Sequence, residues 1–167
     1  LRKLFRFLVA VEDIPIKIRV YFVQNLEELI TDFNEIEKLD VIILTVNLFD
    51  PKSIYQYSKD IVEEFNEIYY FQGVSILVGL DTEHLFKKQA SKNLRISRYH
   101  LEEITRYLNL IYCYEIYNKN EDIIEIYKKI FNDFIFRFRY SNPELFEQAQ
   151  LYGKSLVKEY NGQFKHF

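Results

Sequence analysis

The stretch from Leu39 to Asp81 limits the possible folds of this chain more than any other. Residues 41–46 read Val-Ile-Ile-Leu-Thr-Val and residues 74–78 read Val-Ser-Ile-Leu-Val. Such continuous apolar runs are typical of strands in a parallel sheet that helices cover on both faces. Between the two runs, apolar residues recur at spacings of three and four, which predicts an amphipathic helix. Asp50 is a favourable N-cap residue for this helix, and Pro51 is favourable at its first position. The stretch therefore predicts a β-α-β unit with parallel strands.

The chain before this unit predicts a hairpin and a helix. Residues 4–11 and 16–23 are both strand-like, and the four residues between them are too few for a parallel crossover. The two segments must therefore pair as antiparallel neighbours. A helix is expected over residues 25–38, with Asn25 as its cap.

The chain after the unit predicts a loop, a strand and three helices. The expected segments are a loop over 80–95, a helix from the Ser97 cap to Leu108, a strand over 111–116 and helices over 122–138 and 144–160. The order β-β-α-β-α-β-α-β-α-α predicts an α/β fold, a three-layer domain with a mostly parallel sheet and one antiparallel edge. We divide the chain into a domain over residues 1–140 and a C-terminal helix and tail over residues 141–167. The apolar side of that last helix is expected to carry Leu145, Ala149, Tyr152, Leu156 and Tyr160.

Composition narrows the class of protein. The 167 residues are enough for one domain with a sizeable core. A net charge of −3 argues against a broad nucleic-acid-binding face. No apolar run approaches the ~20 residues of a membrane span, and no signal-peptide pattern opens the chain. We therefore expect a cytoplasmic protein without a nucleic-acid partner, a transmembrane segment or membrane-surface contact.

Two short segments resemble a known family. Asp40 to Val46, followed by Asp50-Pro51-Lys52-Ser53, is similar to the fourth strand and third helix of Ras-like small GTPases of the Rab and Ras type. The order of elements over roughly residues 4–138 resembles the same domain from its second strand onward, with a helix added at the C-terminus. The resemblance implies a three-layer Ras-like fold.

The motif positions of that family carry other residues in this chain. Its D-x-x-G motif corresponds to residues 22–25, where Phe22 cannot ligate Mg²⁺. Its guanine motif N-K-x-D corresponds to Leu80-Asp81-Thr82-Glu83, in which only Glu83 keeps a carboxylate at the family's position. Of its S-A-K loop, aligned with residues 117–119, only Lys119 is preserved. None of the four glycines belongs to a phosphate-binding G-x-x-x-x-G-K-[ST] loop.

The family's first strand has no counterpart in these residues. It lies upstream of Leu1, or another chain supplies a strand, or the strands on either side pair directly. Because the chain contains no Met, the first explanation is the most economical.

The resemblance implies a conditional set of site residues. If a nucleotide binds, its ligands would be Asp81, Glu83, Asn118 and Lys119. Read without the resemblance, Asp81 and Glu83 are more simply solvated loop carboxylates. No catalytic residue and no metal site is expected, because His84 and His100 share no ligand spacing and Cys113 lies within a predicted strand.

Two functions follow from this reading. The first is a pseudo-GTPase-like protein-interaction or scaffold module in an intracellular complex, without nucleotide hydrolysis and without a cofactor. Its expected contact surfaces are the hairpin at residues 4–23 and the C-terminal helix. The alternative is a divergent small GTPase that binds GTP or GDP with Mg²⁺, with its phosphate-binding loop outside these residues. A receiver- or flavodoxin-like domain is a third possibility, disfavoured by the opening hairpin.

Overall fold

The protein forms two compact α/β units. The computed structural model describes residues 3–26, 28, 39–54, 57–86, 95–159 and 165–166. One unit consists of residues 24–126, and the other combines residues 1–23 with residues 127–167. Both units contain strands and helices, so the α/β class is confirmed.

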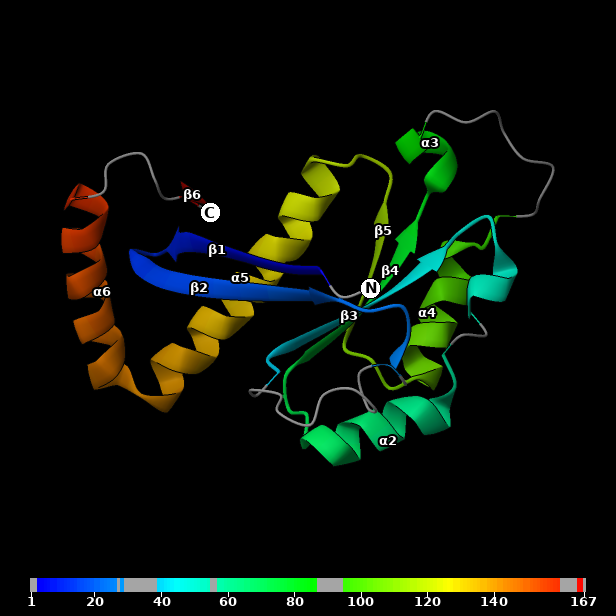
Figure 1. Ribbon diagram of the computed structural model, residues 1–167, viewed down its shortest axis with the longest axis horizontal. Coiled ribbons are helices and arrows are strands. Elements are labelled where there is room, and N and C mark those ends of the chain that lie inside the picture. The colour runs from blue at the N-terminus through cyan, green and yellow to red at the C-terminus, as the bar shows by residue number, and fades with distance from the viewer. Residues whose placement is uncertain are drawn as a thin grey trace. The chain divides into compact units, whose positions relative to one another are not determined.

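A three-stranded parallel sheet forms the core of the unit of residues 24–126. Strands β3 (Val41–Asn47), β4 (Val74–Leu80) and β5 (Tyr112–Ile116) lie in the order β3-β4-β5 (Figure 1). Every residue of β4 from 74 to 79 is buried, as expected of a central strand that is covered on both faces. The predicted parallel pairing of residues 41–46 with 74–78 is confirmed.

The connection between β3 and β4 differs from the prediction. A single helix was expected from Pro51, but a short 3₁₀ turn, η1 (Pro51–Ile54), comes first, and helix α2 (Lys59–Tyr69) begins later. Ser58 caps α2, because its side chain accepts a hydrogen bond from the backbone of Ile61. The side chains of Ser53 and Tyr57 bond to the backbone of β3. These bonds hold the connection beside the strand and delay the start of the helix.

The remaining helices of this unit follow the prediction with one addition. Helix α4 (Arg98–Tyr107) is confirmed, and the Ser97 side chain accepts from the backbone of His100 as its cap. The predicted loop over 80–95 contains a short helix, α3 (Thr82–Phe86). Asn25 accepts a hydrogen bond of 2.8 Å from the Glu28 backbone, as a helix cap does. The rest of the helix predicted over 25–38 lies outside the described residues. Helix α5 (Glu121–Ser141) begins in this unit and continues into the other.

The second unit is built on the predicted hairpin. Strands β1 (Lys3–Val11) and β2 (Ile14–Phe22) pair antiparallel along their whole length. The short strand β6 (Lys165–His166) pairs parallel with β1, which gives the order β2-β1-β6. The described strands therefore form two separate sheets, and the prediction of one sheet with an antiparallel edge is wrong for them. The C-terminal residues of β6, which carried no strand prediction, pair with the free edge of β1.

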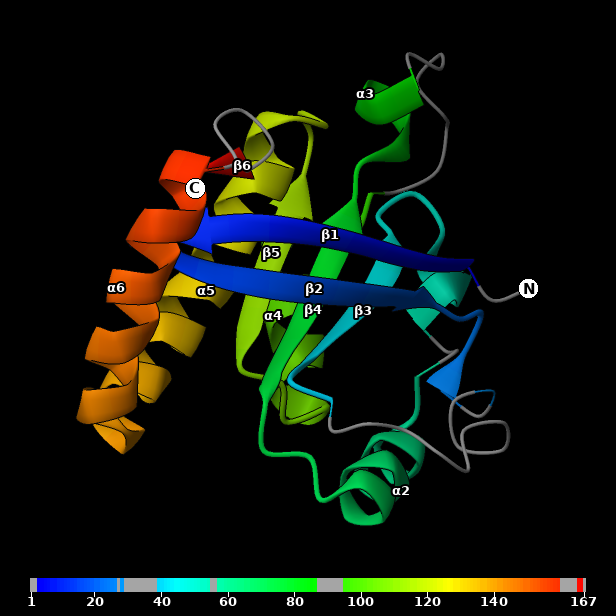
Figure 2. The same ribbon diagram turned by 60° about the vertical axis from the view of Figure 1, so that its left-hand side comes forward.

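Helix α6 (Pro143–Glu159) packs against the hairpin turn in the same unit (Figure 2). The prediction placed Leu145 and Tyr152 on its apolar side, yet both are exposed, and Phe146 and Gly153 are buried instead. Gly153 sets this orientation, because a Cβ at that position would lie 1.6 Å from the carbonyl oxygen of Asp13. Only a residue without a side chain allows the helix to approach the turn so closely.

Candidate functional site

The carboxyl ends of the parallel strands meet at one edge of the sheet, where open α/β sheets usually carry their ligand sites. Two hydrogen bonds join these ends. The backbone N–H of Asp81, after β4, donates to the carbonyl of Ile116 at the end of β5, over 3.0 Å. The Thr82 hydroxyl donates over 3.0 Å to the Asn47 side chain at the end of β3. The edge is therefore a connected surface made of three strand ends.

An arginine lies between two buried carboxylates at this edge. The Arg95 Nε is 3.3 Å from Asp81 Oδ2, and its Nη2 is 2.5 Å from Glu115 Oε2. The side chains of Asp81 and Glu115 are only 1% and 5% exposed, and that of Arg95 is 30% exposed. The Tyr117 hydroxyl donates to Glu115 and accepts from Arg95, whose guanidinium also lies 5.2 Å from the centre of the Tyr117 ring.

His84 supplies further hydrogen bonds to Asp81. Its backbone N–H donates to Asp81 Oδ1 over 3.1 Å, and its ring Nδ1 lies 2.9 Å from the same oxygen. Burial raises the pKa of the Asp81 carboxyl, but the bonds from His84 and Arg95 outweigh burial and leave that pKa below its usual value. Asp81 is therefore a charged, fully engaged carboxylate. We call Asp81, His84, Arg95, Glu115 and Tyr117 the Arg95 cluster.

The structure corrects the interpretation of Asp81 as a solvated loop carboxylate. Asp81 is buried because it follows directly on a buried strand, and the cation that pairs with it comes from the far end of the predicted loop. Glu83 lies in α3 and is half-buried. Asn118 and Lys119 are exposed in the loop between β5 and α5. The backbone of Asp81 bonds to Ile116, two residues before Asn118.

The loop between β5 and α5, which contains Asn118, is held by hydrogen bonds between its own residues. The Asp122 carboxylate accepts from the backbone N–H groups of Tyr117 and Asn118, over 2.6 and 2.7 Å. The Asn118 side chain accepts from the backbone of Asn120. These bonds, like those at Asp81, satisfy polar side chains at the edge from within the chain.

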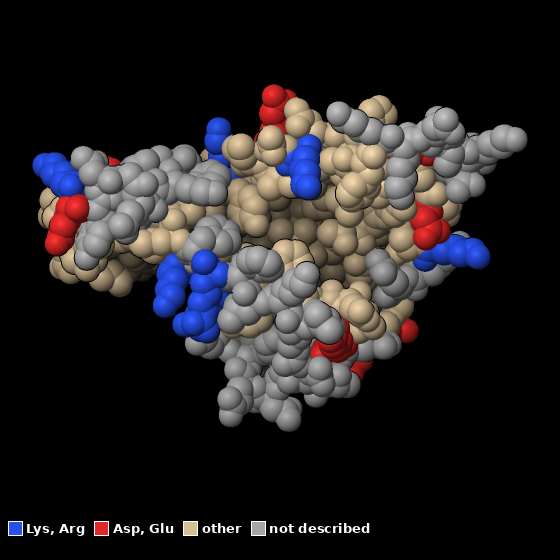
Figure 3. Space-filling model, turned by 45° about the horizontal axis from the view of Figure 1, so that its top comes forward, with Lys and Arg blue, Asp and Glu red and all other residues tan. Residues whose placement is uncertain are grey.

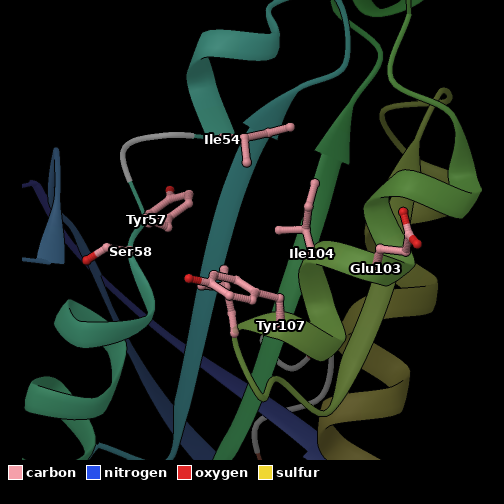
Figure 4. A pocket seen from close by; sticks show the side chains of 7 residues that line it. Ile54, Tyr57, Ser58, Glu103, Ile104 and Tyr107 are labelled. Carbon is pink, nitrogen blue, oxygen red and sulfur yellow. The ribbon is translucent and has the colours of Figure 1, made fainter.

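A hollow lies between η1 and α4 in the same unit. Its larger part has a volume of about 450 Å³, and the side chains around it come from η1, the start of α2 and α4 (Figure 4). The adjoining part, of about 340 Å³, reaches Arg95 and His100. Two of its polar groups are engaged, because Ser58 accepts from Ile61 and His100 contacts Ser97. The hollow suits an apolar group better than a phosphate. The larger part is lined by Ile54, Tyr57, Ser58, Glu103, Ile104, Tyr107 and Leu108.

Other classes of site find little support in the described residues. Within them, no three His, Cys, Asp or Glu side chains gather as metal ligands would. Cys113 lies in β5, where burial raises the pKa of its thiol and so weakens it as a nucleophile. On the face seen in Figure 3, the described Lys and Arg side chains lie in small, separate groups, several of them beside Asp or Glu. A search of the described helices finds none with the length and apolar character needed to cross a membrane.

Sequence reasoning missed Arg95, His84 and Glu115 as parts of the edge. A signal was present, since Asp81 follows an apolar strand and Glu115 lies within one. Buried carboxylates need a cation or several donors, and the predicted loop over 80–95 offers several basic side chains. The pattern does not say which of them reaches the strand ends.

Comparisons with known proteins do not place the chain in a family. No protein-family model matches it, and no curated protein is significantly similar to it. The fold and the Arg95 cluster are therefore the basis for any functional conclusion.

Proposed function

We propose that the chain is a Ras-like domain that has lost nucleotide chemistry and serves as a protein-interaction or scaffold module in an intracellular complex. The observation that carries this proposal is the Arg95 cluster. At the strand end that corresponds to the family's guanine motif, Asp81 is buried and bonded to Arg95 and His84. The edge is closed by the chain's own side chains.

The free energy needed to separate the Asp81–Arg95 ion pair supports the loss of nucleotide binding. A base that displaced Arg95 from the Asp81 carboxylate would break this ion pair. Separating one partner from a buried pair costs about 3–5 kcal/mol. At about 1.4 kcal/mol for each factor of ten, this penalty weakens a dissociation constant roughly 10²- to 10⁴-fold.

Exposed apolar side chains on the second unit support a role in protein contacts. The hairpin exposes Leu8 and Phe22, and α6 exposes Leu145, Leu151 and Tyr152. Apolar and aromatic side chains of this kind form the cores of protein–protein interfaces. The hairpin at residues 4–23 and helix α6 are the surfaces that we propose for partner binding.

Calorimetric titration of the protein with GTP, GDP and ATP, each with Mg²⁺, tests the proposal. We expect no saturable heat at nucleotide concentrations up to 1 mM, about the range in which small GTPase-like affinities would be unmistakable. Saturable binding of GTP or GDP would overturn the proposal and favour a divergent GTPase. The variants Lys119→Ala and Glu83→Gln then locate the site, because binding at the implied residues must weaken in both.

A further inference from the structure

Strand β3 lies at one edge of the parallel sheet, and the backbone groups on its outer side point away from β4. The backbone N–H of Val74 donates to Asp40 and that of Leu48 donates to Leu80, so even-numbered residues of this stretch face β4. The odd-numbered residues of β3 direct their backbone groups to the other side. Among the described strands, none pairs with β3 on that side.

Two hydroxyl groups occupy the position that a neighbouring strand would take. The Tyr57 hydroxyl accepts from the Thr45 N–H over 3.2 Å and donates to the Thr45 carbonyl over 3.0 Å. The Ser53 hydroxyl accepts from the Asn47 N–H over 3.0 Å and lies 3.2 Å from the Asn47 carbonyl. Thr45 and Asn47 are two residues apart, the spacing at which a paired strand would bond to this edge. Figure 4 shows Tyr57 on the segment that runs beside β3.

The covered strand has the composition of a segment that pairs with itself. Residues 41–47 read Val-Ile-Ile-Leu-Thr-Val-Asn, seven residues without charge, Pro or Gly and with four β-branched aliphatic residues and a threonine. Segments of this kind are those most prone to pair edge to edge with identical copies. The Ile43 side chain is 42% exposed. Charged residues, which usually protect such an edge, are absent from the strand itself.

We propose that Tyr57 and Ser53 shield β3 from pairing with β3 of a second copy of this chain. The two hydroxyls bond to the N–H and carbonyl of Thr45 and to the N–H of Asn47, where the groups of a neighbouring strand would bond. Without these bonds, β3 of a second copy can compete for this edge, antiparallel about a two-fold axis. This inference does not depend on the proposed function.

The double variant Tyr57→Phe with Ser53→Ala tests the proposal, since it removes both hydroxyls and keeps the aromatic ring. Sedimentation equilibrium should show an association constant at least tenfold higher than in the parent chain. Hydrogen exchange at the Thr45 and Asn47 amides should be faster than in the parent at low concentration and slow down as the variant associates. The single variant Tyr57→Phe, a milder change, should show the same direction of both effects.

Two further variants make the result decisive. Tyr140→Phe with Ser141→Ala makes the same chemical changes on exposed residues of α5 and should associate as the parent does. Adding Ile43→Lys to the double variant places a charge on the edge strand and should restore the parent's association constant. The proposal is overturned if the folded double variant associates no more than the parent, or if Ile43→Lys leaves its association unchanged.

Discussion

Replacement of Arg95 by methionine tests how strongly the cluster holds the strand ends together. Arg95→Met keeps much of the side-chain volume and removes the cation between two carboxylates that are 1% and 5% exposed. Breaking a buried ion pair costs about 3–5 kcal/mol. In the variant, Asp81 keeps its hydrogen bonds from His84, and the Arg95 side chain is itself partly exposed in the parent. We therefore expect a loss at the lower end of this range, about 3 kcal/mol of unfolding free energy. In a chain of this size that loss lowers Tm by about 6–12 °C.

The pH dependence of this effect has a definite sign. The pKa of Asp81 is lowered in the folded protein, so its contribution to stability is present above the unfolded value of about 3.9 and is lost as the pH falls through the folded pKa. In Arg95→Met one of the bonds that lower the pKa is absent. The difference in unfolding free energy between parent and variant should therefore be largest near neutral pH and shrink below about pH 4.

Urea titration followed by far-ultraviolet circular dichroism and tyrosine fluorescence measures both effects, since the chain has no Trp. The matched control is Lys59→Met, which removes an exposed ion pair with Glu63 and should cost no more than about 0.5 kcal/mol. The reasoning is refuted if Arg95→Met lowers the unfolding free energy no more than Lys59→Met does. It is also refuted if the difference in unfolding free energy between Arg95→Met and the parent stays the same below about pH 4.

Three other substitutions test the packing and backbone arguments. Gly153→Ala should destabilise the protein by about 1–3 kcal/mol or more in urea titration, because its Cβ would overlap the Asp13 carbonyl; Ser155→Ala on the same helix should have little effect. Tyr70→Gly should raise the free energy of unfolding by up to about 1 kcal/mol, because Tyr70 ends α2 at φ 46° and relief of this left-handed strain exceeds the entropic cost of glycine. Tyr70→Ala, which keeps the strained backbone, should give no such gain. Asp81→Asn should lower the free energy of unfolding at pH 7 and flatten its loss in acid, as followed by chemical denaturation at several pH values.

The sequence predicted the parts of the fold whose signals are local. Continuous apolar runs identified β3 and β4, and the short connection at residues 12–15 required an antiparallel hairpin. The caps Ser97 and Asn25 were found because a helix start needs a side-chain acceptor. What remained hidden depends on distant contacts. Periodicity placed a helix start at Pro51, but hydrogen bonds to β3 moved it to residue 59.

The same division applies to α6 and to the candidate site. Hydrophobic spacing favoured a helix face with Leu145 and Tyr152, whereas the close approach of Gly153 to the hairpin turn selected another face. The resemblance drew attention to Asp81, but its contacts with His84 and with Arg95, 14 residues away, keep its carboxyl charged. The Ras-like resemblance and the boundary near residue 140 stay predictions.

The measurement that tests the central claim most directly is a ¹H–¹⁵N correlation spectrum of the protein during titration with GDP and Mg²⁺. It reads the Arg95 Nε–H together with the backbone of residues 80–83 and 117–119. The closed Arg95 cluster predicts that none of these signals moves in a saturable way at nucleotide concentrations up to 1 mM, well above those that a nucleotide-binding domain of micromolar affinity would need. Saturable shifts confined to these residues would show that a nucleotide opens the cluster, and would contradict the account.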